Sequence, residues 1–163
     1  VQEHVLASAS RDQTVRLWDV DRQAEVLHLG QHADEVYTCS FSQDGGSVAA
    51  GGAGRLFNLV DIRSGAITFK SATEQPILSS AFSDMWTWWA AYCSGSSSVV
   101  VDLRTQREVA RFDCYDGEST ALAFCGTNLV CGDSLGRLYV LQINRSNFVA
   151  PASPEHQGRA AAF

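Results

Sequence analysis

The chain has 163 residues, of which 45% are hydrophobic, so it is long enough to bury one substantial core and predicts about one domain. The formal net charge of −6 argues against a nucleic-acid duplex as the partner, because a duplex-binding surface needs a basic patch that neutralises phosphates. An apolar run of about 18 residues is absent from the sequence, which leaves a membrane-spanning helix without support.

Along the chain, apolar and polar residues alternate, and this pattern predicts short β-strands in place of helices. Residues 36–41 alternate, as do residues 77–82 and 120–124. Turn-forming sequences such as Asp44-Gly45-Gly46 and Arg63-Ser64-Gly65 separate the apolar stretches. We therefore expect many short strands joined by tight turns.

The dipeptide Trp18-Asp19 begins a repeat that returns as Val60-Asp61, Val101-Asp102 and Leu141-Gln142. The separations are 42, 41 and 40 residues, close to the period of about 40 to 45 residues that four-stranded propeller blades have. Two further sets of apolar residues repeat with spacings of 41 and 42 residues: Phe41, Phe82 and Phe124, and Val26, Ile67 and Val109. Three markers with one period predict a repeat architecture.

Residues 6–19, which end in Trp18-Asp19, resemble half a blade of the WD-repeat β-propellers. Residues 30–36 are similar to the Gly-His entry of that family, with one residue inserted between Gly30 and His32. The resemblance covers roughly residues 4–143 and implies an all-β propeller of about three to four blades, each a four-stranded antiparallel sheet. Since the common form of the family has seven blades, we expect an incomplete arc of a seven-bladed ring.

The repeat divides the chain into blades at about residues 1–29, 30–70, 71–112 and 113–143, which together make a partial propeller. Residues 144–163 have no period and are expected to form an irregular tail. A propeller removes its sheet edges by radial closure, which this number of blades does not achieve in a seven-bladed ring. We therefore expect the C-terminal part of a larger propeller, with missing blades upstream or in another chain.

The resemblance implies a structural tetrad, in which His, Ser or Thr, Asp and Trp of one blade hydrogen-bond to one another. Ser8, Asp12 and Trp18 fit three of these roles, while His32 belongs to the next repeat. There, Gly54 and Val60 stand where the family has Asp and Trp. A complete tetrad cannot be assembled, so apolar packing between sheets should carry the stability of the blades.

Met85 and three tryptophans, Trp86, Trp88 and Trp89, form an aromatic cluster where the family usually has a polar turn. One interpretation is an exposed ledge for a partner, because aromatic residues are enriched at binding hot spots. The other is that Trp88 or Trp89 packs into the core between blades. Alternation along a strand places these two on opposite sides, so at least one should meet the neighbouring blade.

In the family, partners tend to bind the surface made by two sets of loops at one end of the blades. Carried over to this chain, the resemblance gives these candidate partner-binding residues: Arg11, Glu35, Tyr37, Arg55, Trp86, Tyr115 and Arg137. Three of them, Arg11, Arg55 and Arg137, recur near corresponding turns and could form a ring of cations for an acidic peptide or a phosphate. The alternative is that these arginines are ordinary solvated loop residues.

Catalytic and cofactor patterns are absent from the sequence, so we predict no catalytic residue, no cofactor and no metal site, and a protein that is not an enzyme. The glycine-rich residues 51–54 precede a strand and lack the helix N-terminus that binds phosphate, so they are interpreted as a turn. Five cysteines form no CxxC pair and are expected to be buried reduced thiols. This predicts an intracellular protein, either cytoplasmic or nuclear.

The leading functional prediction is a non-catalytic scaffold whose loops bind peptides or domains of partner proteins within a complex. A narrower alternative comes from residues 132–142, which look like the terminal blade in apoptosome-type nucleotide-binding scaffolds and would then act as a sensor. An alternative of another class is a propeller associated with nucleic acid, which would need stacking aromatics beside cations. Trp86 to Trp89 near Arg104 are the only candidates for that role.

Overall fold

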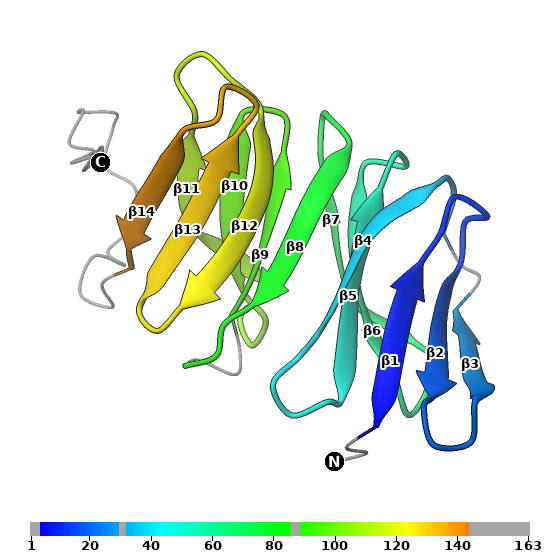
Figure 1. The fold of residues 1–163 in the computed structure, drawn as a ribbon. Helices are drawn as coiled ribbons and strands as arrows, with labels where there is room; N and C mark the ends of the chain where they lie inside the picture. Colours follow the sequence, from blue (N-terminus) through cyan, green and yellow to red (C-terminus); the bar gives the residue numbers. More distant parts are fainter. Residues whose placement is uncertain (1–3, 30–31, 86–88, 144–163) are drawn as a thin grey trace.

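The computed structural model describes residues 4–29, 32–85 and 89–143, and within these residues it contains four antiparallel β-sheets and no helix (Figure 1). The four sheets follow one another along the chain and stand side by side, without closing into a ring among the described residues. The all-β fold class predicted from the alternation is confirmed. Residues 144–163, for which an irregular tail was predicted, lie outside the described residues.

Each sheet is built from strands that are consecutive in the sequence. Sheet 1 contains β1 (Val5–Ala9), β2 (Val15–Asp19) and β3 (Ala24–Leu29), and sheet 2 contains β4 (Val36–Phe41), β5 (Ser47–Gly52), β6 (Leu56–Asp61) and β7 (Ile67–Ala72). Sheet 3 contains β8 (Ile77–Phe82), β9 (Trp89–Ser94), β10 (Ser97–Asp102) and β11 (Arg107–Asp113), and sheet 4 contains β12 (Ser119–Cys125), β13 (Asn128–Asp133) and β14 (Leu138–Gln142).

The repeat predicted from the sequence reappears in the backbone geometry. The pairing between the last two strands of sheets 1, 2 and 3 shifts register at one repeated place, directly before Trp18, Val60 and Val101. The turn that follows each of these strands has a left-handed residue at the corresponding position, which is Gln23, Gly65 or Gln106. Sequence spacing and backbone geometry therefore describe one unit that is repeated.

Three apolar clusters hold the sheets together, one at each contact between neighbouring sheets. Sheets 1 and 2 meet through Leu17 and Val60, and sheets 2 and 3 meet through Phe57, whose ring stacks on Tyr92 at a centroid distance of 4.7 Å. Every residue of β9 is buried, because sheet 3 is covered on both faces. Apolar packing between sheets thus organises the fold.

The first strands of sheets 2, 3 and 4, namely β4, β8 and β12, adjoin one another. Their hydroxyl groups form side-chain bonds across the sheets: Ser80 Oγ lies 3.0 Å from Thr38 Oγ1 and 3.2 Å from Ser40 Oγ. The backbone N–H of Ser80 also donates to Thr38 Oγ1 at 3.1 Å. These bonds fix sheets 2 and 3 relative to each other beside the apolar cluster.

Two glycines that were interpreted as part of a turn belong to β5. A side chain at Gly51 would place its Cβ 2.7 Å from Ile77, and one at Gly52 would come within 2.0 Å of the Glu35 carbonyl oxygen. Of the three glycines in this segment, Gly54 alone lies in the turn, together with Ala53. The glycines are required because the start of β8 and the segment before β4 approach this strand closely.

Candidate interaction surface

Two sets of connections lie at one end of the sheets, the upper end in Figure 1. We call this surface the loop face; it consists of residues 10–13, 32–35, 53–55, 73–76, 95–96, 114–118 and 134–137. Backbone hydrogen bonds join neighbouring loops: Ala53 N–H donates to the Glu35 carbonyl at 2.9 Å, and Thr73 N–H donates to the Arg55 carbonyl at 2.9 Å. The loop face is therefore held in a defined shape by main-chain bonds.

The same linkage continues across the other sheets. Val36 N–H donates to the Ser10 carbonyl at 3.1 Å, joining the β1–β2 turn to the start of β4. Ser134 N–H donates to the Glu118 carbonyl at 2.8 Å, which joins the two loops of sheet 4. Because main-chain groups make these bonds, substitution of a loop side chain should leave the arrangement intact.

Arg11, Glu35 and Tyr37, three of the predicted partner-binding residues, form one cluster on the loop face. Arg11 donates from Nε and Nη2 to Glu35 Oε1 at 2.9 and 2.7 Å, and the Tyr37 hydroxyl donates to Glu35 Oε2 at 3.1 Å. The hydrogen bond to Glu35 raises the pKa of both Arg11 and Tyr37. The Arg11 side chain remains 83% exposed, so a partner could still reach it.

Arg55 is exposed in the turn between β5 and β6 and has a left-handed backbone with φ of 55°. It forms no ion pair with a carboxylate of the residues that the structure describes. A side chain in this conformation costs conformational energy that glycine would avoid. Arg55 is thus the arginine of this surface whose charge is most available to a partner.

Arg137 is anchored to Asp133 at the end of β13. Arg137 Nε donates to Asp133 Oδ2 at 2.6 Å, and the Tyr139 hydroxyl donates to the same oxygen at 3.1 Å. Burial alone would raise the pKa of Asp133, but the hydrogen bonds from Arg137, Tyr139 and Leu135 lower it. Asp133 therefore stays ionised and neutralises Arg137.

Tyr115 is the most exposed large hydrophobic residue on the loop face, at 91%. Leu135 in the neighbouring loop is also exposed, and Asp116 lies between the two loops with Oδ2 at 3.9 Å from Arg137 Nη1. Two linked loops that carry an exposed aromatic ring, an exposed leucine and a carboxylate can contact a partner through both apolar and polar groups. Leu135 and Asp116 carry no repeated pattern, so their place on this surface could not be predicted from the repeat.

The predicted ring of free cations is therefore not what the structure contains. Arg11 and Arg137 are each paired with a carboxylate, and Arg55 is the exception. The pairing follows from the chain's excess of acidic residues, since carboxylates on adjoining loops reach both arginines. Trp86, another predicted partner-binding residue, lies outside the described residues.

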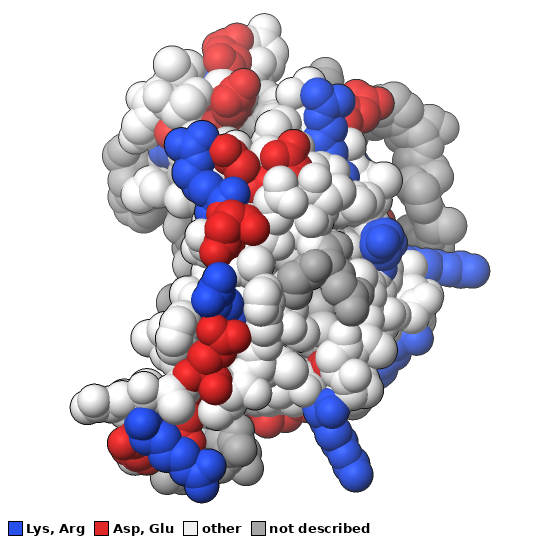
Figure 2. All heavy atoms as spheres, turned by 90° about the vertical axis from the view of Figure 1, so that its right-hand side faces the viewer, with Lys and Arg blue, Asp and Glu red and all other residues white. Residues whose placement is uncertain are grey.

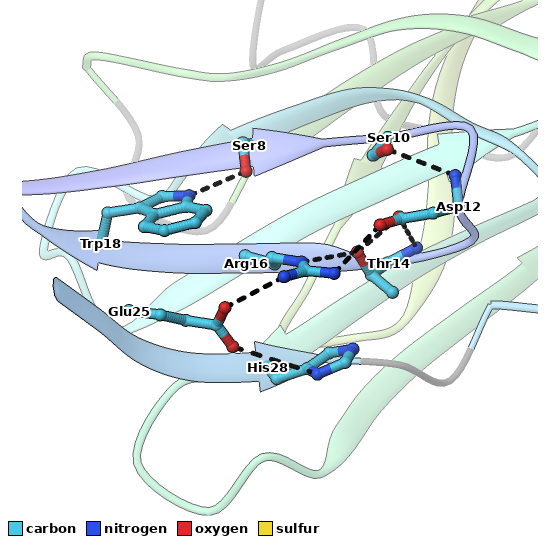
Figure 3. A network of polar contacts seen from close by, with 8 residues as sticks. All are labelled: Ser8, Ser10, Asp12, Thr14, Arg16, Trp18, Glu25 and His28. Carbon is cyan, nitrogen blue, oxygen red and sulfur yellow. Dashed lines mark hydrogen bonds and ion pairs between the residues drawn. The ribbon is translucent and has the colours of Figure 1, made fainter.

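The tetrad-like residues of the first repeat are partly connected, as Figure 3 shows. Trp18 Nε1 donates to Ser8 Oγ at 2.9 Å, joining β2 to β1. Asp12 instead accepts from the hydroxyl of Thr14 at 2.6 Å and from Arg16 Nη2 at 3.0 Å. The Trp–Ser bond is thus present, while Asp12 organises the turn beside it.

His32 lies apart from these residues, over sheet 2. Its Nδ1 is 3.4 Å from Nδ2 of Asn58, and the Asn58 side chain is buried with Oδ1 unpaired among the described residues. Burial, followed by the nearby charge of Lys70, lowers the pKa of His32. The neutral imidazole is therefore favoured at this place, which suits a structural role better than a charged one.

Of the aromatic cluster and its methionine, the structure describes Trp89 and Met85. Trp89 is buried in the apolar cluster between sheets 3 and 4, and Met85 is 57% exposed. Trp86 and Trp88 lie outside the described residues. Of the two interpretations, core packing holds for Trp89.

Sheet 1 carries a series of ion pairs on its exposed side. Figure 2, which shows the right-hand side of Figure 1, has acidic and basic groups alternating in a column along the left of the view. Arg16 binds Asp12 at 3.0 Å and Glu25 at 3.1 Å, and Arg22 lies 3.5 Å from Asp19. The paired charges leave this side without a continuous basic or acidic patch.

The cysteines are free thiols, and Cys93, Cys114 and Cys131 are buried. Burial raises the pKa of Cys93 to about 11, so this thiol stays protonated and inert at neutral pH. The prediction of buried thiols does not hold for the other two, since Cys39 is half-buried and Cys125 is exposed. Within residues 4–29, 32–85 and 89–143, no group of three potential ligands is arranged to hold a metal ion, and no helix is long and apolar enough to cross a membrane.

Comparison with known sequences gives a match to a family model described as "WD domain, G-beta repeat", at residues 2–19 and 24–60. The chain is 54% identical over 41 residues to the F-box-like/WD repeat-containing protein TBL1X of Mus musculus, which is 25% of this chain and 8% of that protein. It is 47% identical over 45 residues to Coronin-7 of Mus musculus, 28% of this chain and 5% of Coronin-7. The chain thus spans a small part of these relatives.

Comparison with solved structures extends the likeness to most of the chain. The Cps50 (Swd1) beta-propeller domain of Myceliophteria thermophila superposes with a TM-score of 0.73 and 21% identity, covering 85% of this chain and 48% of that one. A chain in the crystal structure of the Mitotic Checkpoint Complex superposes with a TM-score of 0.81 and 20% identity, covering 88% and 48%. The predicted β-propeller architecture is confirmed, and membership of a seven-bladed ring stays a prediction.

Proposed function

This chain carries WD repeats in the arrangement of a partial β-propeller, and on that premise we propose that it is a non-catalytic scaffold that binds partner proteins through its loop face. The observation that carries the proposal is the backbone linkage of neighbouring loops, such as the bonds from Ala53 to Glu35 and from Ser134 to Glu118. A surface fixed before binding loses little conformational entropy when a partner docks. Such preorganisation suits a surface that recognises a partner.

The side chains on this surface support a protein partner. Tyr115 and Leu135 offer exposed apolar area, while Arg55 offers a cation that no described carboxylate neutralises. Tyrosine and arginine are enriched among residues that dominate binding energy at protein interfaces. A peptide or a domain with an apolar anchor and a nearby carboxylate fits this combination.

The titratable groups of the loop face support a non-catalytic role. Glu35 and Asp133 accept hydrogen bonds from arginine side chains, and the pKa of Asp133 is lowered. A general acid or base works best with a pKa near the operating pH, and the lowered pKa of Asp133 lies away from it. His32, the histidine on this face, has a lowered pKa and contacts buried Asn58.

A nucleic-acid partner receives less support from the described residues. Trp89 is buried and Arg104 is bonded to Asp102 at 2.8 Å, so neither offers the exposed stacking ring or free cation that single-stranded binding uses. The narrower role as a sensor of apoptosome type rests on the resemblance of residues 132–142 and remains a prediction. We therefore favour a protein partner.

The test selects peptides from a random display library on the full chain and measures their affinity for variants. Tyr115→Ala should weaken binding by about 30-fold or more, the loss expected when an aromatic hot spot is truncated. Val20→Ala is the matched control, since Val20 is also an exposed apolar residue but lies in the turn between β2 and β3, outside the loop face. Equal affinity of both variants for every selected peptide would overturn the proposed surface.

A further inference from the structure

A hollow of about 390 Å³ opens on the loop face between sheets 2 and 3. The β9–β10 turn beside it consists of residues 95–96 alone. The corresponding turns of the other three sheets are longer, at residues 10–14, 53–55 and 134–137. The residues around the short turn are also small, since Ser94, Ser96 and Ser97 line the hollow. A short turn with small neighbours therefore leaves space at the end of sheet 3.

The hollow lies between Arg55 and Tyr115, the two residues on which the proposed function most depends. On one side Thr73, which lines the hollow, donates its N–H to the Arg55 carbonyl at 2.9 Å. On the other side Cys114, the residue before Tyr115, donates its N–H to the Ser96 carbonyl at 2.8 Å. A peptide that contacts both Arg55 and Tyr115 therefore passes the hollow.

Two buried residues, Tyr92 of β9 and Val99 of β10, give the hollow an apolar base. The Tyr92 ring stacks on Phe57 at a centroid distance of 4.7 Å, and its hydroxyl lies 3.1 Å from Ser71 Oγ. These contacts fix the ring in place. A long side chain can therefore pack its aliphatic stem on this base while its polar end bonds to the walls.

The hydroxyl groups on the walls are acceptors toward a ligand. A hydroxyl has one proton to donate, and three of these groups already donate theirs within the protein. Thr73 Oγ1 and Ser94 Oγ donate to the Gln75 carbonyl oxygen at 2.7 and 2.6 Å. Ser97 Oγ donates to Asp113 Oδ1 at 2.5 Å. Lone pairs remain on the three hydroxyl oxygens, so these walls favour a ligand that donates hydrogen bonds.

The charges at the hollow also favour a cationic ligand. Glu74 lines it with an exposed side chain, and Asp113 adjoins it through Ser97. Among the described residues, neither of these carboxylates forms an ion pair. Arg111, which also lines the hollow, donates to Glu108 from Nε at 2.9 Å and from Nη2 at 2.7 Å, so its charge is balanced.

We propose that this hollow binds the side chain of a lysine or an arginine in a partner peptide. The aliphatic stem packs on the apolar base, the N–H groups donate to the hydroxyl oxygens, and Glu74 balances the charge. An acidic side chain would bring further acceptors to the same oxygens and is disfavoured. The proposal rests on the proposed function and narrows its partner to a peptide with a basic residue between an apolar anchor for Tyr115 and a carboxylate for Arg55.

Binding of display-selected peptides to the full chain tests this proposal. Peptides that lose affinity with Tyr115→Ala should carry a lysine or an arginine, and its replacement by glutamine should weaken binding by about tenfold. Glu74→Lys should weaken the basic peptide by about tenfold at low ionic strength and hardly affect the glutamine variant, which lacks the charge that is repelled. Glu118→Lys is the matched control, because Glu118 is an exposed residue of the same face outside the lining, and it should leave both affinities unchanged.

Ser96→Phe tests whether the space itself is used. Ser96 is exposed and bonds to Cys114 through its carbonyl oxygen, so the larger side chain should occupy the hollow without loss of that bond. The variant should bind the basic peptide at least about tenfold more weakly, because the anchoring side chain no longer enters. Urea unfolding shows whether it is folded; if it is not, Glu74→Lys decides alone.

The two proposals fail in different ways. If Tyr115→Ala weakens binding but Glu74→Lys and Ser96→Phe do not, the loop face remains the binding surface and the basic side chain in the hollow is overturned. Selected peptides that carry an acidic residue and bind more tightly to Glu74→Lys would also overturn it, in favour of an anion at Arg111. If none of the three variants weakens any selected peptide, both proposals are overturned.

Discussion

Sheets 1 and 3 are copies of the same repeated unit, but different interactions stabilise them. In sheet 1, Ser8 and Trp18 are joined by a hydrogen bond, on a face that no described sheet covers. In sheet 3 the corresponding positions are Tyr92 and Val101, both buried against sheet 2. The repeat therefore requires the strand geometry, and whether a neighbouring sheet covers a face decides between hydrogen bonds and apolar packing there.

Charged side chains in the middle strands differ between sheets 1 and 3 in the same way. Arg16, in the middle of β2, binds Asp12 and Glu25, whereas Val99 occupies its place in β10. A charged side chain under a neighbouring sheet would lose its hydration, which is costly unless it is fully paired. An ion pair is therefore possible at this position of sheet 1, while the ion pairs of sheet 3, such as Arg111 with Glu108, lie at exposed positions.

The largest effect is expected where sheet 3 meets sheet 2. Phe57→Ala removes a fully buried ring that stacks on Tyr92, and we expect the free energy of unfolding to fall by about 3–5 kcal/mol. Urea unfolding followed by circular dichroism measures the change. Val20→Ala, at an exposed position, should change the stability by less than about 0.5 kcal/mol. A Phe57→Ala loss below about 1 kcal/mol would contradict tight packing between these sheets.

A smaller effect is expected from the hydrogen bond of sheet 1. Ser8→Ala leaves the Trp18 indole N–H without its acceptor and should lower the free energy of unfolding by about 1 kcal/mol. Trp18→Phe in the Ser8→Ala background should then cost less than it does alone, because the bond is already absent. Additive losses in this double-mutant cycle would show that the bond contributes nothing to stability.

His32, over sheet 2 between these two regions, should make the stability depend on pH, since its pKa is lowered by burial and then by Lys70. The folded state favours the neutral imidazole, so its contribution is present above the unfolded pKa of about 6.5 and is lost as pH falls below it. Thermal unfolding between pH 7.5 and 5 should show this loss, and His32→Gln should flatten the curve. An unchanged slope in the variant would contradict the burial of a neutral His32.

The smallest effect is expected from the Arg11–Glu35 pair, because Arg11 is largely exposed. Arg11→Gln should lower stability slightly at low ionic strength, and the difference from the unmodified chain should vanish at about 1 M salt, where charges are screened within about 3 Å. Melting temperatures at both salt concentrations measure it. A difference that persists at high salt would mean that Arg11 acts by packing and not by charge.

The sequence predicted the repeat because each unit repeats its own backbone requirements. Spacings of 42, 41 and 40 residues between the markers were enough to place the four sheets. The glycines before Gly54 were misplaced, since the sequence does not reveal that Ile77 and the Glu35 carbonyl approach β5. These contacts join segments that are far apart in the sequence, so they become visible only in the folded structure.

The candidate surface was predicted less completely than the fold. Arg11 and Glu35 were both identified, but their pairing spans 24 positions between different loops and could not be inferred. Arg137 and Asp133 are four positions apart across a tight turn, so that pair could have been found. Trp89 could be placed on a core face only once sheet 4 was known to cover it.

The most direct test of the central claim, that the loop face is the binding surface, is a hydrogen–deuterium exchange footprint of the full chain with a bound display-selected peptide. We expect slower exchange in residues 53–55 and 114–118, with turns at the opposite end of the sheets, such as residues 44–46 and 64–65, unchanged. Slower exchange at those opposite turns, with no change on the loop face, would contradict it.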